Sequence, residues 1–177
     1  MDRIEELIQF IEREDPNQWS DEWLEAVHKL AEIKDQRVGT SLCKFLRVKD
    51  NRWFATAKRS HAIHALGRIR DPKCIQPLCD VLDDTKHDSL LNSDTMLLNE
   101  IIRILSSFGD AAVVPLCQKL KSGKSTTARS MAAFGLASLR NSATVPILKS
   151  RLKPIFGERD RGVLDAIQSA IASIEKG

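Results

Sequence analysis

The sequence predicts an all-α fold: an α-solenoid, or superhelix, of about four to five helix-pair repeats. Two observations lead to this prediction. First, the 177 residues include only eight glycines, six prolines and no tyrosine, and they show no run that alternates apolar and polar side chains as a strand would. Second, a pattern of apolar residues recurs along the chain at a nearly constant offset. A helical repeat accounts for both.

The repeat is clearest in the first half of the chain. Seven residues recur 36 positions later, in the order Ala26, Leu30, Ile33, Asp35, Leu42, Cys43, Leu46, then Ala62, Leu66, Ile69, Asp71, Leu78, Cys79, Leu82. Two further units follow between residues 101 and 120 and between residues 132 and 152, and residues 167–174 begin another. We therefore expect units of about 36 residues that share one structure.

Each unit contains two amphipathic segments joined by a turn. Apolar residues fall at i, i+3, i+4 and i+7 within residues 62–69 and again within residues 75–82. Between them, Asp71 precedes Pro72, which disfavours helix at Asp71 and suits the first turn of the next helix. Asp35 and Asn141 stand at the equivalent place, where a side-chain oxygen can cap the second helix.

We expect one domain over residues 1–177. An amphipathic segment at each end suits the polar caps that a stack of repeats needs. The expected division is a cap helix in residues 1–19, repeats in residues 20–48, 53–84, 94–122 and 125–153, and a second cap helix in residues 159–176.

The segment ALGRIRDPKCIQPLCDVLDD, residues 65–84, resembles the HEAT-like repeat of the phycobilisome-lyase (PBS lyase) type. Its Ala-Leu-Gly, the aliphatic residue two places on, the aspartate and the apolar pair before leucine match the usual run of that repeat. LASLRNSATVPILKSRL, residues 136–152, and residues 26–46 resemble it as well. The resemblance implies stacked helix pairs. Because this repeat occurs in lyases, hydroxylases, chaperone-like factors and scaffolds, it does not select one function.

Two features that could suggest catalysis or ligand binding have simpler interpretations. Cys43, Cys79 and Cys117 occupy the same place in three units, which indicates small apolar fillers of the core, whereas Cys74 lies on the turn side and is expected to be partly exposed. The sequence SGKST at residues 122–126 lacks the earlier glycine of a phosphate-binding loop and follows a helix rather than a strand.

The histidines also fail as a metal motif. His61 and His64 fall beside the apolar stripe, so we expect them on the outer face of their helix. The family that the sequence resembles includes an iron hydroxylase. That activity would require His-Glu pairs at the starts of the inner helices, and this sequence has none. We therefore name no catalytic residue, no metal ligand and no cofactor.

Charge is divided into blocks. Residues 1–36 carry eleven acids and four bases, residues 47–73 eight bases and two acids, residues 74–118 seven acids and two bases, and residues 119–162 ten bases and two acids. In the first basic block, aromatic side chains stand among cations, a mixture that can grip an acidic partner or stack on bases. The predicted basic and aromatic rim consists of Arg52, Trp53, Lys58 and Arg59.

The second helices of such repeats usually line the concave face of the solenoid. Projecting the repeat register onto that face predicts a partner-binding surface of Thr40, Lys44, Arg47, Gln76, Asp80, Asp83, Gln118, Lys121, Ser150 and Lys153. Its mixed charge suits a polypeptide better than a uniformly anionic strand. We expect a non-enzymatic interaction module or scaffold that binds a protein partner.

Two alternatives stay open. The resemblance implies a lyase-like or chaperone-like factor acting on bilin-bearing phycobiliproteins, and the basic blocks suggest nucleic-acid binding, which the acidic blocks argue against. No run of about twenty apolar residues and no signal peptide is apparent, so we expect no membrane span, a cytoplasmic location and free thiols. The sequence leaves the oligomeric state and the partner's identity open.

Overall fold

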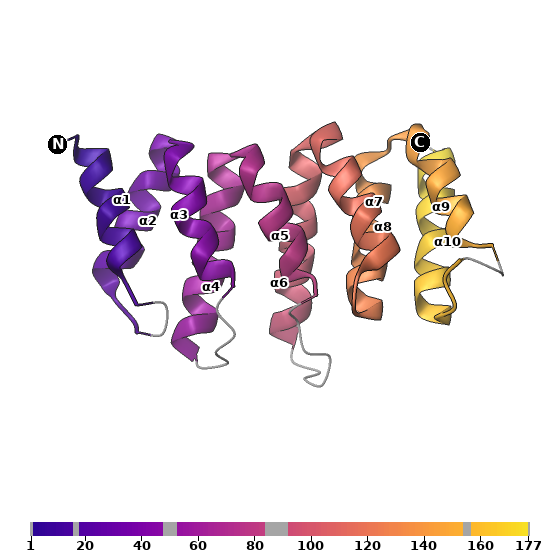
Figure 1. Cartoon of the computed structure of the whole chain (residues 1–177), viewed down its shortest axis with the longest axis horizontal. Helices are drawn as coiled ribbons and strands as arrows, with labels where there is room; N and C mark the ends of the chain where they lie inside the picture. Colours follow the sequence, from indigo (N-terminus) through magenta and orange to yellow (C-terminus); the bar gives the residue numbers. More distant parts are fainter. Residues whose placement is uncertain (1, 16–17, 48–52, 84–91, 154–156, 177) are drawn as a thin grey trace. The chain divides into compact units, whose positions relative to one another are not determined.

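The computed structural model describes residues 2–15, 18–47, 53–83, 92–153 and 157–176. Within these ranges it contains ten α-helices and three short 3-10 helices, and no strand (Figure 1). The chain therefore has an all-α fold of the α-solenoid type, as predicted. No helix in these ranges combines the length and the apolar character that crossing a membrane requires.

The helices gather into two compact units, Met1–Val81 and Leu82–Gly177. In the amino-terminal unit, α1 packs against α2 and α3, both of these pack against α4, and α3 also contacts η1 and α5. Its elements are α1 (Arg3–Arg13), α2 (Asp21–Ile33), α3 (Arg37–Leu46), α4 (Trp53–Ile69), η1 (Pro72–Cys74) and α5 (Ile75–Val81).

The carboxy-terminal unit is centred on one helix. α8 packs against α6, α7 and α10, and α9 packs against α10 (Figure 1). Its elements are α6 (Asn92–Ser107), η2 (Gly109–Ala112), α7 (Val113–Ser122), α8 (Thr126–Leu139), η3 (Ser142–Thr144), α9 (Val145–Arg151) and α10 (Arg161–Lys176). The single domain and the repeat boundaries given above stay predictions.

The apolar stripes form the core of each unit. In α2, Trp23, Val27 and Leu30 have no exposed surface, and the Trp23 ring lies 4.9 Å from the ring of Phe45 on α3. Burying one large apolar side chain is worth about 1.5–3 kcal/mol, so these stripes account for why short helices with little stability of their own hold together.

The turns repeat a common geometry. The side chains of Asp35, Asp71 and Asn141 each accept a hydrogen bond from the backbone N–H two residues on, at 2.9, 3.0 and 2.9 Å respectively. Asp71 and Asn141 cap the short 3-10 helices that lead into the second α-helices, rather than those α-helices themselves. Asp35 bonds the first residue of α3, whose N-cap residue Gln36 provides no side-chain cap.

The residue before each of these Asp or Asn residues has a left-handed backbone conformation. Lys34, Arg70 and Arg140 have φ of 58°, 56° and 50°, and their N–H groups bond back to carbonyl groups of the preceding helix. Glycine usually occupies such a position because it has no Cβ to clash. In this chain a long cationic side chain stands there in all three turns, next to the carbonyl end of a helix.

Candidate functional site

One face of α7 is exposed along its whole length. Leu116 and Leu120 are buried in the carboxy-terminal unit, where α7 packs against α8. Val114, Gln118 and Lys121 follow at i, i+4 and i+7 on another face and are exposed, Val114 to 63%. An exposed valine beside a lysine gives this face both an apolar and a cationic component.

The short helix α9 presents a similar surface. It buries Leu148, and it exposes Ile147, which is 40% accessible, and Ser150, whose hydroxyl donates to the Ile147 carbonyl at 2.6 Å. Lys153 follows the helix and is exposed. We call the exposed residues Val114, Gln118, Lys121, Ile147, Ser150 and Lys153 the α7/α9 face.

The α7/α9 face carries uncompensated positive charge. Neither α7 nor α9 contains an aspartate or a glutamate. Lys149 on α9 pairs with Glu175 at 2.8 Å, whereas Lys121 and Lys153 form no ion pair with any residue that the structure describes. The two free cations and the exposed aliphatic side chains are the features of this surface that a ligand could use.

In the amino-terminal unit the predicted surface is less available. Thr40 and Arg47 on and after α3 are exposed. Lys44 is half-buried: its ammonium donates to the Glu12 carbonyl and lies 4.9 Å from the centre of the Phe45 ring. Burial lowers the pKa of Lys44 from its ordinary value, against the opposing effect of Glu12. Lys44 thus helps to hold α1 on α3.

The α5 residues pair with each other. Gln76 Nε2 donates to Asp80 Oδ1 at 2.9 Å, and both residues are exposed. An i, i+4 pair of this kind stabilises a helix slightly and leaves both groups in reach of solvent.

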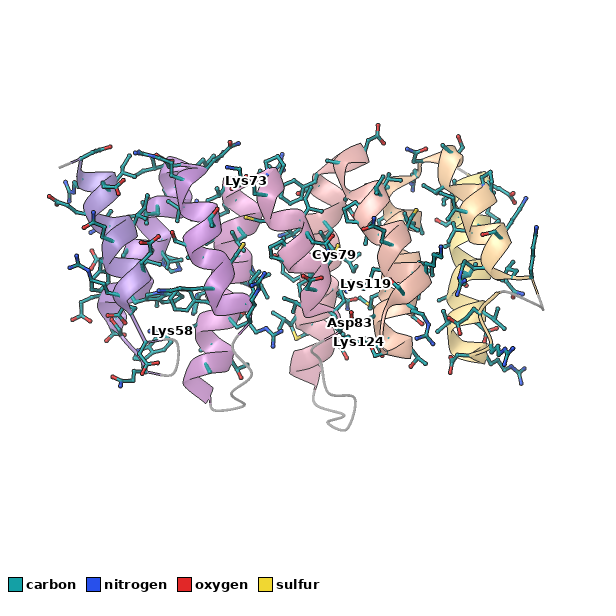
Figure 2. All side chains as sticks on the ribbon, viewed as in Figure 1. Lys58, Lys73, Cys79, Asp83, Lys119 and Lys124 are labelled. Atoms are coloured by element: carbon teal, nitrogen blue, oxygen red, sulfur yellow. The ribbon has the colours of Figure 1, made fainter. Side chains whose placement is uncertain are left out.

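Asp83, also predicted to face a partner, is engaged inside the carboxy-terminal unit. Its Oδ2 lies 2.6 Å from Lys119 Nζ and its Oδ1 accepts from Lys124 N at 2.7 Å (Figure 2). Its side chain is only 13% exposed. Burial raises the pKa of Asp83, but hydrogen bonds from Lys119 and Lys124 outweigh it and hold that pKa below the ordinary value. These contacts tie Asp83 to the end of α7.

The structure describes only part of the predicted rim. Arg52 and the side chain of Trp53 lie outside the described residues. Arg59 is half-buried, and Lys58 has no exposed surface. Lys58 therefore contributes no charge to an exposed rim; it lies inside the amino-terminal unit (Figure 2).

A signal for the buried lysines is present in the sequence. Lys58 precedes Ala62 by four residues, and Lys119 follows Leu116 by three, so both lie on apolar stripes. The prediction that Lys58 belongs to an exposed rim did not take this spacing into account. The acidic partners, Glu14 and Asp83, are 44 and 36 positions away and could not be assigned from spacing.

The histidines pack against each other on α2 and α4. The rings of His28 and His61 meet edge to face with centroids 5.7 Å apart, and Trp19 approaches His61 at 6.3 Å. Burial lowers the pKa of His61, and the neighbouring His28 and His64 lower it further. Among the residues that the structure describes, no three or more His, Cys, Asp or Glu side chains form a group that could hold a metal ion.

A shallow hollow of about 440 Å³ lies in the amino-terminal unit on α1 and α2. It is lined by Arg3, Ile4, Leu7, Lys29, Glu32 and Ile33. Ile33 is 52% exposed, so the hollow has an apolar wall open to solvent, with both signs of charge among its lining residues.

Comparison with known proteins agrees with this architecture. Residues 58–84 match the family described as the PBS lyase HEAT-like repeat, a stretch that includes most of α4 and all of α5. This match supports a HEAT-like repeat protein, with the matched repeat at residues 58–84. None of the curated proteins matches it.

Proposed function

We propose that this HEAT-like repeat protein is a non-enzymatic interaction module that binds a protein partner on the surface of its second helices. The observation that carries the proposal is the α7/α9 face: Val114 and Lys121 are exposed on α7, Ile147 is exposed on α9, and Lys153 is exposed just after α9. Lys121 and Lys153 have no ion-pair partner among the described residues. Helical repeats commonly bind proteins on extended helix surfaces.

The chemistry of the α7/α9 face favours a particular class of partner. The ammonium groups of Lys121 on α7 and Lys153 just after α9 attract carboxylates, and neither helix contains an acid. The exposed valine and isoleucine side chains gain from being covered by apolar groups. The best match is a partner segment that alternates acidic and aliphatic residues. In the amino-terminal unit, Thr40, Arg47, Gln76 and Asp80 are exposed and are proposed as further contacts.

The test is a comparison of partner recovery. The tagged chain and a variant carrying both Lys121→Glu and Lys153→Glu are used for affinity capture from a lysate of the source organism, and co-purifying proteins are quantified by mass spectrometry. We expect a partner recovered with the parent chain to fall at least tenfold with the variant. Equal recovery of every partner would rule out the α7/α9 face.

A charge-matched control separates surface from net charge. Arg161 and Lys176 are exposed on α10, outside the α7/α9 face, so Arg161→Glu together with Lys176→Glu changes the net charge by the same amount. This control is expected to recover the partner normally. If both variants lose the partner equally, binding depends on overall charge, and the site assignment fails.

Two other functions remain as candidates. The match at residues 58–84 keeps a lyase-like or chaperone-like factor acting on bilin-bearing proteins under consideration, and mixing the chain with bilin would then change the absorbance spectrum. The basic block of residues 119–162 keeps nucleic-acid binding under consideration, and the affinity for a labelled oligonucleotide would then fall steeply as salt is raised.

A further inference from the structure

Two thiols meet in the amino-terminal unit. Cys43 lies on α3, and Cys74 ends η1, which packs against α3. Cys43 is partly exposed, whereas Cys74 has no exposed surface. The expectation that Cys74 is partly exposed was wrong, because η1 turns its side chain toward α3 rather than toward solvent.

A glycine on α3 makes room for this contact. A Cβ built on Gly39 would lie 2.9 Å from Cys74 Sγ and 2.6 Å from Asp71 Oδ2, closer than real Cβ atoms approach such groups. Gly39 and Cys43 are one helical turn apart on the same face of α3. Because Gly39 has no side chain, the Cys74 thiol and the Asp71 carboxylate can lie close to α3, one helical turn from Cys43.

The Asp71 carboxylate has an unused oxygen at this place. Asp71 is 2% exposed, and its Oδ1 accepts from Lys73 N at 3.0 Å. Its Oδ2 is buried and forms no hydrogen bond with any residue that the structure describes. A buried carboxylate oxygen without a donor is costly, and it is a ready acceptor for a thiol proton.

The two thiols have unequal roles. The neighbouring Cys74 thiol lowers the pKa of Cys43, while Cys43, burial and the negative charge of Asp71 raise the pKa of Cys74. A thiolate is the reactive form of cysteine, and Cys43 is also the thiol that solvent can reach. Cys43 is thus suited to react first and Cys74 second.

We propose that Cys43 and Cys74 form an oxidisable dithiol that reacts with a hydroperoxide and closes to a disulfide between α3 and η1. In the first step the Cys43 thiolate attacks the peroxide, forming an S–O bond and breaking the O–O bond. The leaving hydroxide or alkoxide takes a proton, and Cys43 becomes a sulfenic acid.

In the second step Cys74 gives its proton to Asp71 Oδ2, and its sulfur attacks the Cys43 sulfur. The S–S bond forms, the S–O bond breaks, and the departing hydroxide takes the proton to become water. With hydrogen peroxide, two thiols and one peroxide yield one disulfide and two waters. The sulfurs must close to about 2.05 Å, and the packing of η1 against α3 places both cysteines on adjoining elements.

The experiment uses the full chain and hydrogen peroxide. After oxidation, remaining thiols are alkylated and the chain is digested with trypsin without reduction. We expect a linked pair of peptides, residues 38–44 and 74–86, with fragment ions that join Cys43 to Cys74 rather than to Cys79. Dithiothreitol is expected to abolish the pair, and Cys43→Ser or Cys74→Ser to reduce it at least tenfold.

Cys117→Ser is the matched control. Cys117 is also partly exposed, burial raises its pKa, and it lies in the other unit, so its replacement is expected to leave the linked pair unchanged. The proposal is overturned if Cys43 oxidises no faster than Cys117, if Cys43 joins Cys79, or if Cys43 proceeds to a sulfinic acid without forming the linked pair.

Asp71→Asn tests the positioning role of the carboxylate. The amide oxygen can still cap η1, so the fold is expected to survive, as circular dichroism will show. The rate of Cys43 oxidation should stay within about twofold, while the sulfenic acid trapped by dimedone should increase at least tenfold. Unchanged trapping would remove Asp71 from the reaction.

Discussion

The ammonium of Lys58 lies 3.1 Å from Glu14 Oε2 and 2.8 Å from the Asp15 carbonyl, and no part of Lys58 is exposed. It also lies 5.1 Å from the centre of the Trp23 ring. The pair joins α4 to the segment that follows α1, 44 positions away in the sequence. A charge in this place must be compensated, because an unpaired buried ammonium is far more costly than an exposed one.

Replacing Lys58 by alanine is expected to destabilise the chain by about 3 kcal/mol, since it removes a buried ion pair, a ring contact and the alkyl packing. Lys58→Met keeps the volume and leaves a glutamate that is 22% exposed, so a loss of about 1 kcal/mol is expected. Urea unfolding followed by circular dichroism measures both free energies.

An exposed pair provides the comparison for Lys58. Lys29 lies 2.5 Å from Glu25, with side chains 46% and 67% exposed. Lys29→Ala should cost less than about 0.5 kcal/mol. If Lys58→Ala costs no more than Lys29→Ala, the buried pair does not hold the unit together.

The Asp83 contacts predict a pH-dependent contribution to stability. Because hydrogen bonds outweigh burial and lower the folded-state pKa of Asp83 below its ordinary value, its ionised form stabilises the fold above that ordinary value. Asp83→Asn should cost about 1–2 kcal/mol at pH 7. The difference from the parent chain should shrink as pH falls below about 4, where the aspartate of the unfolded chain becomes protonated, and should vanish once the aspartate of the folded chain is protonated as well.

Urea unfolding at several pH values between 2 and 7 measures this difference. Comparing the two chains removes contributions from other carboxyl groups, such as Glu158, whose pKa is lowered by backbone N–H groups and Arg129 against the effect of burial. A difference that stays constant down to pH 2 would contradict the role of the Asp83 charge.

Two helical glycines should respond differently to the same change. In Gly39→Ala, the new Cβ meets Asp71 Oδ2 at 2.6 Å and Cys74 Sγ at 2.9 Å, both buried, so we expect a loss of about 1–3 kcal/mol. In Gly135→Ala, the nearest atoms are the methyl groups of Leu116 at 3.1 Å, which can shift. The gain in helix propensity of about 1 kcal/mol then offsets the strain.

Thermal unfolding of the two variants gives the measurement. Gly39→Ala should lower the midpoint by several degrees, and Gly135→Ala should leave it nearly unchanged or raise it. Equal effects would mean that the space at Gly39 is not needed for the Asp71 and Cys74 packing.

The left-handed backbone conformation of Arg140, at the end of α8, indicates a substitution that should stabilise the chain. Arg140 has φ of 50°, so Arg140→Gly should relieve strain and raise the free energy of unfolding by about 0.5–1 kcal/mol. Ser138→Gly, an exposed position within the same helix, should instead lower it by about 0.5–1 kcal/mol, since glycine there adds flexibility and removes the exposed hydrogen bond from Ser138 Oγ to the Phe134 carbonyl. A loss of stability in both variants would contradict the prediction, and urea unfolding distinguishes the outcomes.

Much of the fold could be predicted because its causes are local. Helical spacing of apolar residues gives the buried faces of α2, α7 and α10, and an Asp or Asn at a fixed place gives the caps. The exposed positions of Gln118, Lys121 and Ser150 follow from the same spacing. That a partner uses these positions is a proposal, because exposure alone does not identify a ligand.

The sequence by itself determined the helices and their turns, since a period of 3.6 residues and a cap depend only on neighbours in the chain. Only the tertiary structure decided that Lys58 and Lys119 are buried in ion pairs, that Asp83 is occupied, and that Cys43 meets Cys74 beside Asp71. Each of these contacts joins residues about 30 or more positions apart, and whether a charge or thiol is buried depends on which side chain the packing of other helices brings opposite it.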